Sequence, residues 1–248
     1  MSALSITPNE INDMKYQRYF KPGQQLLLKT LRDTEKNGYA ELISVFIVSL
    51  EGDSLTLSLP YGTDAADRYP FSKGLLFEIT TEAMGLGIRA TGTFQKKIDE
   101  NQFTLQIHPD LQMFQRRVSQ RFDCKLGIRF SRAAKTLQTM REIWKKNIEV
   151  LHSPEAPLIF DGFKSCKINI SSGGVRFSIK PPGNQGELCL ILINLEDGKP
   201  PVCAIAEVIW ACIQDTSTVD VGTRFINILS EDQQRIDDFI AKEMQSSQ

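Results

Sequence analysis

The sequence predicts a mainly β protein that consists of two β-barrel domains. Short apolar runs rich in β-branched residues recur along both halves of the chain. Clusters of turn-forming residues separate these runs at fairly regular intervals. Helical periodicity is weak in the first half and is confined to two segments of the second. Strands at this spacing are typical of small barrels, and also of sandwiches.

The first half contains a set of short candidate strands. In residues 54–60, leucines alternate with polar residues, so one face of this strand is expected to be buried and the other solvated. Turn residues at 51–53 and 99–101 are typical of hairpin loops between neighbouring strands. The expected strands are 26–31, 42–50, 54–60, 75–80, 88–97 and 102–108. We assign them to a first domain, residues 1–112.

The second half, which we assign to a domain of residues 113–248, combines strands with two helices. The expected strands are 121–130, 165–170, 175–179, 187–195, 202–212 and 220–228. Apolar residues at spacings of three or four predict an amphipathic helix at 133–151, inserted between the first two strands. Its apolar face is expected to pack on its own barrel, or alternatively to join two chains in a homodimer. A capping-box pattern at 230–233 begins a second helix, expected to dock on the barrel.

Composition excludes several classes of function. A formal net charge of -1 argues against a general nucleic-acid or membrane-surface binder. No apolar run reaches the roughly 18–20 residues that span a bilayer, so we expect a cytoplasmic protein without membrane insertion. The five cysteines form no C-x-x-C pair, and the two histidines have no ligand motif near them. With no nucleophile motif or carboxylate pair either, we expect no metal, no cofactor and no enzymatic activity.

Basic residues gather where the second domain begins. Residues 116–132 contain six basic residues and a single acid, Asp123. Three of them, Arg116, Arg117 and Arg121, stand at the domain boundary. Arginine binds phosphate bidentately, pairs with the O6/N7 edge of guanine and stacks on bases. By itself, however, such a cluster also fits a solvated edge strand.

A second polar element is the turn of residues 169–174. Asn169 and Ser171 offer side-chain donors and acceptors at the end of a strand. Gly173 and Gly174 are expected to adopt positive φ and to let the backbone approach a ligand closely. Taken alone, this segment also fits an ordinary hairpin turn.

Together the two elements resemble the PilZ domain, a six-stranded barrel whose pattern is R-x-x-x-R followed by [D/N]-x-S-x-x-G. Arg117 and Arg121 match the first part, and Asn169, Ser171 and Gly174 match the second. The segment 221–225 with the helix after it resembles the end of that barrel. The first half resembles the N-terminal barrel of the YcgR-type flagellar brake proteins, so the resemblance covers nearly the whole chain.

This resemblance implies a receptor for cyclic di-GMP whose interdomain arrangement changes on binding. It further implies regulation of motility or surface behaviour through a flagellar motor or another protein partner. The residues that would bind the ligand are Arg116, Arg117, Arg121, Asn169, Ser171, Gly173 and Gly174. In this family a large basic residue at the position of Arg116 implies an intercalated pair of cyclic di-GMP molecules per subunit. The alternative is a two-barrel adaptor with a vestigial site that acts through protein contacts alone.

The sequence departs from the family pattern in two respects. Asn169 stands where Asp is commoner, which removes a charged acceptor for guanine. The helix at 133–151 is an insertion relative to a simple strand connection. It is open whether this helix shields the site or joins subunits.

Overall fold

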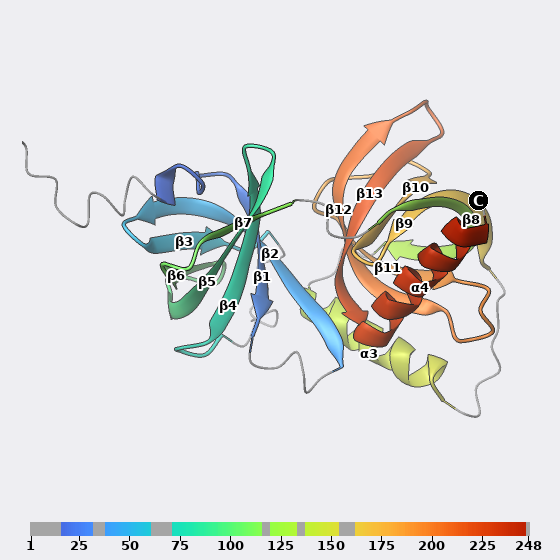
Figure 1. Ribbon diagram of the computed structural model, residues 1–248, viewed down its shortest axis with the longest axis horizontal. Helices are drawn as coiled ribbons and strands as arrows, with labels where there is room; N and C mark the ends of the chain where they lie inside the picture. The colour runs from blue at the N-terminus through green and yellow to red at the C-terminus, as the bar shows by residue number, and fades with distance from the viewer. Residues whose placement is uncertain are drawn as a thin grey trace, which may run out of the picture. The chain divides into compact units, whose positions relative to one another are not determined.

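A computed structural model of the chain describes residues 16–31, 38–60, 71–115, 120–132, 137–153 and 162–246. The chain divides into two compact units, one of residues 1–34 and 42–116 and the other of residues 35–41 and 117–248. Each unit contains a closed antiparallel barrel of six strands (Figure 1). The predicted fold class, mainly β with two barrels, is confirmed.

The first barrel is formed by β1 (Gln25–Thr30), β2 (Tyr39–Glu51), β3 (Ser54–Ser58), β4 (Leu76–Ala83), β5 (Leu86–Lys97) and β6 (Gln102–Ile107). Antiparallel pairing joins them in the closed order β1–β2–β3–β6–β5–β4–β1. Alternate residues point into the barrel, so that Leu55 and Leu57 of β3 are fully buried. These strands coincide with the six predicted from the sequence, apart from their ends.

A further short strand, β7 (Gln112–Phe114), pairs with β5 at the end of the first unit. The ring of Phe114 occupies the space over Gly87, where a Cβ atom would lie 2.5 Å from the ring. The guanidinium of Arg89 lies 5.0 Å from the centre of the same ring. No strand is predicted at these residues from the sequence. Phe114 therefore packs on the first barrel, two residues before the unit boundary after residue 116.

The second barrel is formed by β8 (Phe122–Arg132), β9 (Lys164–Ser171), β10 (Gly174–Ile179), β11 (Leu188–Asn194), β12 (Val202–Ile213) and β13 (Val219–Leu229). Its closed order is β8–β9–β10–β13–β12–β11–β8. Counted within each unit, this order is the same as that of the first barrel. The two halves therefore share one topology, although their sequences show no evident repeat.

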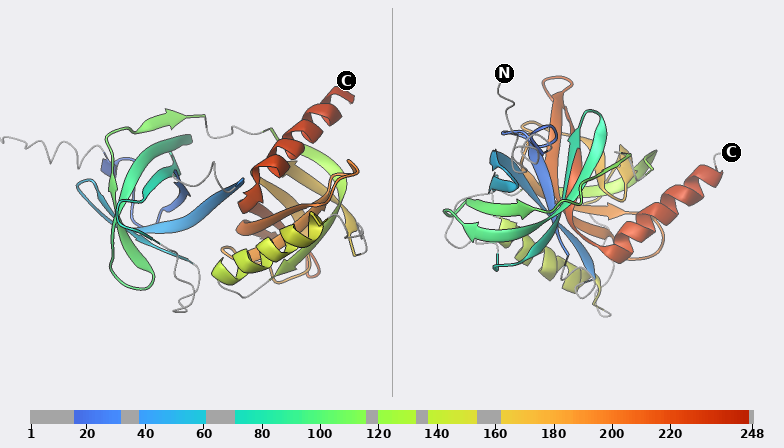
Figure 2. Two further views of the ribbon diagram at one scale, coloured as in Figure 1. Left: turned by 90° about the horizontal axis from the view of Figure 1, so that it is seen from below. Right: turned by 60° about the vertical axis from the view of Figure 1, so that its left-hand side comes forward.

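Two helices lie against the second barrel (Figure 2), α3 (Leu137–Leu151) on β11 and β12 and α4 (Ser230–Ser246) on β9 and β13. Met140 and Trp144 of α3 are buried, and the indole Nε1 of Trp144 donates a hydrogen bond to the Cys203 carbonyl at 2.8 Å. Ile236 and Ile240 of α4 are also buried. Packing of the inserted helix on its own barrel and docking of the C-terminal helix are thus confirmed.

The start of β2 belongs to the second unit, which the sequence does not reveal. Tyr39 and Glu41 are register partners of Leu229 and Asn227 at the end of β13. The Tyr39 ring meets the ring of Trp144 edge-on at a centroid distance of 5.1 Å. The chain therefore passes between the units after residues 34, 41 and 116.

Candidate ligand site on the second barrel

The motif residues that the structure describes lie at one end of β8, β9 and β10. Asn169 and Ser171 belong to the end of β9, and Gly174 begins β10. Arg121 directly precedes Phe122, whose register partner is Ile170, so the backbone at Arg121 runs beside the Ser171 end of β9. The structure thus brings together the two sequence elements. Arg116 and Arg117 lie outside the described residues.

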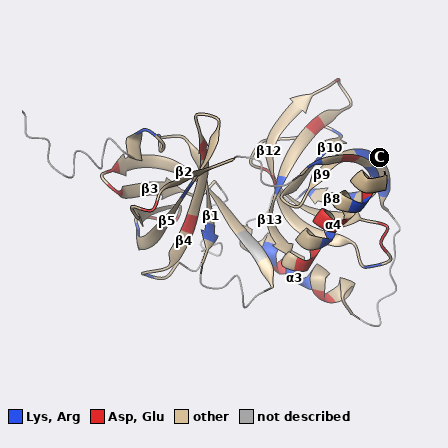
Figure 3. Cartoon of the chain, in the orientation of Figure 1, with Lys and Arg blue, Asp and Glu red and all other residues tan. Residues whose placement is uncertain are grey.

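Basic residues recur along β8, β9 and β10 (Figure 3). Arg121 is exposed, and its side chain has no ion pair or hydrogen bond to another residue in the described part of the chain. Among these same residues, Lys125 of β8 and its register partner Lys167 of β9 also lack an acidic partner. This face of the barrel therefore carries positive charge that the barrel does not neutralise.

A row of residues crosses the outer face of the barrel from strand to strand. It runs through Asp123 (β8), Asn169 (β9), Arg176 (β10), Gly222 (β13) and Trp210 (β12), each the register partner of the next. Asn169 donates a hydrogen bond from Nδ2 to Oδ1 of Asp123 at 3.0 Å. The guanidinium of Arg176 lies 3.5 Å from the same oxygen. We call these five residues the outer-face row.

Trp210 ends the outer-face row with an exposed aromatic surface. The side chain lies against Gly222, where a Cβ atom would come within 2.1 Å of the indole Nε1, and Trp210 is still 41% exposed. An exposed aromatic face is a surface on which nucleobases stack. Sequence reasoning missed this residue because it stands within the apolar run of β12 and resembles a core residue.

A groove of about 640 Å³ lies over the β8–β9–β10 end of the row. It is lined by Asp123, Cys124, Lys125, Lys167, Ile168, Asn169, Arg176, Phe177, Ser178 and Asp220. Its volume is within the range of ordinary small-molecule sites. Burial raises the pKa of the Cys124 thiol to about 11, so this thiol is protonated and is a poor nucleophile near neutral pH.

The turn of residues 171–174 is shaped by contacts with β13. Ser171 is buried, and its hydroxyl donates to the Gly174 carbonyl at 3.3 Å. A Cβ atom on Gly174 would lie 2.1 Å from the Thr223 carbonyl oxygen, whereas one on Gly173 would meet nothing within 4 Å. Neither glycine has positive φ, so that prediction is wrong. Gly174 is needed because the backbone of β13 passes close by.

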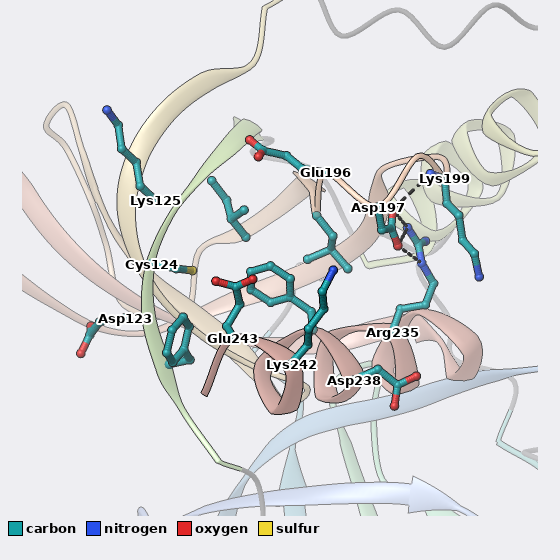
Figure 4. A pocket seen from close by; sticks show the side chains of 14 residues that line it. Asp123, Cys124, Lys125, Glu196, Asp197, Lys199, Arg235, Asp238, Lys242 and Glu243 are labelled. Atoms are coloured by element: carbon teal, nitrogen blue, oxygen red, sulfur yellow. Dashed lines mark hydrogen bonds and ion pairs between the residues drawn. The ribbon is translucent and has the colours of Figure 1, made fainter. Parts of the chain in front are cut away.

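A second hollow, of about 610 Å³, lies between β8, the loop after β11 and α4 (Figure 4). Its one arginine, Arg235, is already paired: it binds Asp197 at 2.9 Å and Asp232 at 2.6 Å. Burial pushes the pKa of Asp197 upward, but hydrogen bonds from Arg235 and from the Lys199 amide outweigh it, so the pKa lies below its ordinary value. These groups hold α4 against the loop after β11, and they already engage the Arg235 guanidinium.

Comparison with protein families identifies the domains. The family model "PilZ domain" matches residues 115–242, and the model "N-terminal PilZ-like domain PilZN1" matches residues 19–115. The chain is a PilZ-domain protein. Its second barrel is the PilZ barrel, and its first barrel is the PilZ-like one, so the resemblance seen in the sequence is confirmed. A search among curated proteins found no match.

Several solved structures are similar to this PilZ protein. The inhibitor of motility MotI/DgrA of Bacillus subtilis is 15% identical over 92% of this chain and 99% of that chain, with a TM-score of 0.37. YcgR of Escherichia coli, in complex with c-di-GMP, is 14% identical over 91% and 85%, with a TM-score of 0.35. MrkH of K. pneumonia is 14% identical over 100% and 97%, with a TM-score of 0.38.

The described residues of the PilZ protein contain no group of three or more His, Cys, Asp or Glu side chains that could hold a metal ion. Among the same residues, no helix is long and apolar enough to cross a membrane. The ligand-binding roles of the seven residues named from the sequence stay predictions. Asp123, Arg176 and Trp210 lie with Asn169 on the outer face of the barrel.

Proposed function

We propose that this PilZ protein is a cytoplasmic receptor for cyclic di-GMP and not an enzyme. The observation that carries the proposal is the meeting of Arg121 with the turn of residues 169–174 on one face of the PilZ barrel. The family motif is complete at its five positions. E. coli YcgR, which is similar to this chain, has been solved in complex with c-di-GMP.

The chemistry of the face suits a ligand with two phosphates and two guanines. Arg121, Lys125 and Lys167, which have no acidic partner among the residues that the structure describes, favour the phosphates. Trp210 offers a stacking surface, and Asn169 offers an amide to a guanine edge. Each charge-assisted hydrogen bond contributes about 1.5–3 kcal/mol net. Several of them, less the ordering cost, suffice for the roughly -8 kcal/mol of a micromolar complex.

We place the conformational response in the connection between the units. Phe114 packs on the first barrel and Phe122 begins the second, so residues 115–121, with all three motif-region arginines, form this connection. We infer that a bound dianion neutralises the like charges of these arginines and draws the connection against the turn of residues 169–174. We propose that the ligand-bound protein acts on a flagellar motor or on another protein partner, and that it thereby regulates motility or surface behaviour.

Replacing Arg121 or Arg117 by alanine is expected to weaken binding of cyclic di-GMP by about tenfold or more, because each variant removes a charge-assisted hydrogen bond. Isothermal titration calorimetry on the full chain measures this. Arg129→Ala is the matched control: Arg129 is an exposed arginine of β8 whose register partner is Leu192 of β11, away from the turn of residues 169–174. Unchanged affinity in the Arg121 variant would contradict the assignment. Absence of any ligand-induced rise in the melting temperature of the wild type would favour the adaptor with a vestigial site.

The second expected result is a stoichiometry of two cyclic di-GMP molecules per chain. Arg116 supplies an additional guanidinium that can lie against a guanine and stabilise an intercalated pair. The same titration gives the molar ratio directly, and Arg116→Ala is expected to lower it to one. A ratio of one in the wild type would rule out the pair without affecting the assignment of the site.

A further inference from the structure

We propose that Asp123 is the carboxylate that recognises guanine in this site and that it determines base specificity. The inference rests on the proposed function, because it concerns how the same groove selects its ligand. The motif position of Asn169 provides an amide where an acid is commoner, so the motif itself brings no carboxylate. Asp123 is the register partner of Asn169 on the neighbouring strand and lines the same groove.

The geometry leaves one Asp123 oxygen available to a ligand. Oδ1 accepts the hydrogen bond from Asn169 and lies near Arg176. Oδ2 has no hydrogen-bond or ion-pair partner within the described part of the chain. The side chain is 77% exposed, although its orientation is fixed by two neighbours. Asp123 is therefore a carboxylate held in place by the protein with a free acceptor on the groove side of the sheet.

A carboxylate has the hydrogen-bonding pattern that guanine requires. The Watson–Crick edge of guanine presents two adjacent donors, N1–H and the N2 amino group, and an ionised carboxylate is an acceptor only. Adenine presents an acceptor at N1, which a carboxylate repels. Hypoxanthine keeps N1–H but lacks the N2 amino group. The free Oδ2 has two lone pairs and can accept from both N1–H and the N2 amino group, so Asp123 would favour guanine over both other bases.

The same pairing explains why residue 169 is an asparagine. An aspartate there would face Asp123 at hydrogen-bond distance, and two neighbouring carboxylates resist simultaneous ionisation. An amide instead donates to Asp123 and orients it. The functional unit is thus one carboxylate and one amide on adjacent strands, and exchanging them should preserve it.

The direction in which affinity changes when the Asp123 charge is removed distinguishes guanine recognition from simple neutralisation of Arg176. Cyclic di-GMP is a dianion, so a carboxylate in its groove opposes binding through Coulomb repulsion. If Asp123 only neutralised Arg176, removal of its charge would strengthen binding. If Asp123 binds guanine, removal of its charge weakens binding despite that relief.

The test compares the full-length wild type with Asp123→Asn and with the exchange Asp123→Asn/Asn169→Asp, by calorimetry with cyclic di-GMP and cyclic di-IMP. We expect Asp123→Asn to lower affinity for cyclic di-GMP by about tenfold or more, the value of one charge-assisted hydrogen bond. The preference over cyclic di-IMP should shrink in that variant. The exchange Asp123→Asn/Asn169→Asp should restore both the affinity for cyclic di-GMP and the preference over cyclic di-IMP. Asp237→Asn is the control, since Asp237 is an exposed α4 residue outside the groove.

Equal or tighter binding of cyclic di-GMP by Asp123→Asn would overturn the inference. So would an exchange variant that has the melting temperature of the wild type but still binds cyclic di-GMP as weakly as Asp123→Asn. Failure of the wild type to bind cyclic di-GMP at all would instead overturn the proposed function. The two failures are therefore distinguished by the wild-type titration alone.

Discussion

Replacing Gly174 by alanine is expected to destabilise the PilZ barrel by about 3 kcal/mol or more, at the upper end of what overpacking costs. The added Cβ would lie 2.1 Å from the Thr223 carbonyl oxygen and 3.1 Å from the Arg224 Cα, and both are strand backbone that cannot rotate away. Urea unfolding followed by tryptophan fluorescence measures this. Both tryptophans, Trp144 and Trp210, belong to the second unit, so the signal reports on that barrel.

Gly173→Ala is the matched control for that experiment. Its Cβ would meet nothing within 4 Å, and its φ is not positive, so stability should change by less than about 1 kcal/mol. Equal stability of the two variants would contradict the steric explanation of Gly174. If Gly174→Ala were as stable as the wild type but no longer bound cyclic di-GMP, Gly174 would have a direct role in ligand binding.

The strands and both helices could be predicted because their signals are local. Alternation in β3 and the spacing of apolar residues in α3 depend only on neighbouring positions. β7 has three residues, too few for a periodic signal, and it pairs with β5 far back in the sequence. The association of Tyr39 with the end of β13 is likewise a contact between distant segments, and no local pattern specifies it.

The motif residues of the site were predictable for the same reason, whereas their surroundings were not. The spacings of Arg117 to Arg121 and of Asn169 to Gly174 are visible within a few residues. The outer-face row depends on the registers of five strands and on closure of the barrel. Gly174 illustrates the difference. The motif singles out this residue, but the reason that glycine is needed there is its close contact with the backbone at Thr223.

Replacing Arg235 by methionine is expected to destabilise the PilZ barrel by about 3–5 kcal/mol, the range for a buried ion pair that loses one partner. Arg235 binds Asp197 with two nitrogens and also donates to the Pro200 carbonyl, so the variant detaches α4 from the loop after β11. Asp232 is 2% exposed and would be left without a cation. Lys242→Met, at an exposed position of the same helix, is the control and should change stability little.

The loss of stability caused by Arg235→Met should be largest near neutral pH and should become smaller on acidification. The pKa of Asp197 is lowered in the folded protein, so its contribution is present above its unfolded pKa and disappears as the pH falls through the folded value. Burial raises the pKa of Asp232, and without Arg235 its charge becomes more costly until acid protonates it. Both effects act in the same direction. Fluorescence-monitored unfolding at pH 7 and near pH 3, which is about one unit below the ordinary pKa of Asp, measures the difference. A destabilisation that is equal at both values would mean that Arg235 acts through packing of its side chain and that its charge contributes little.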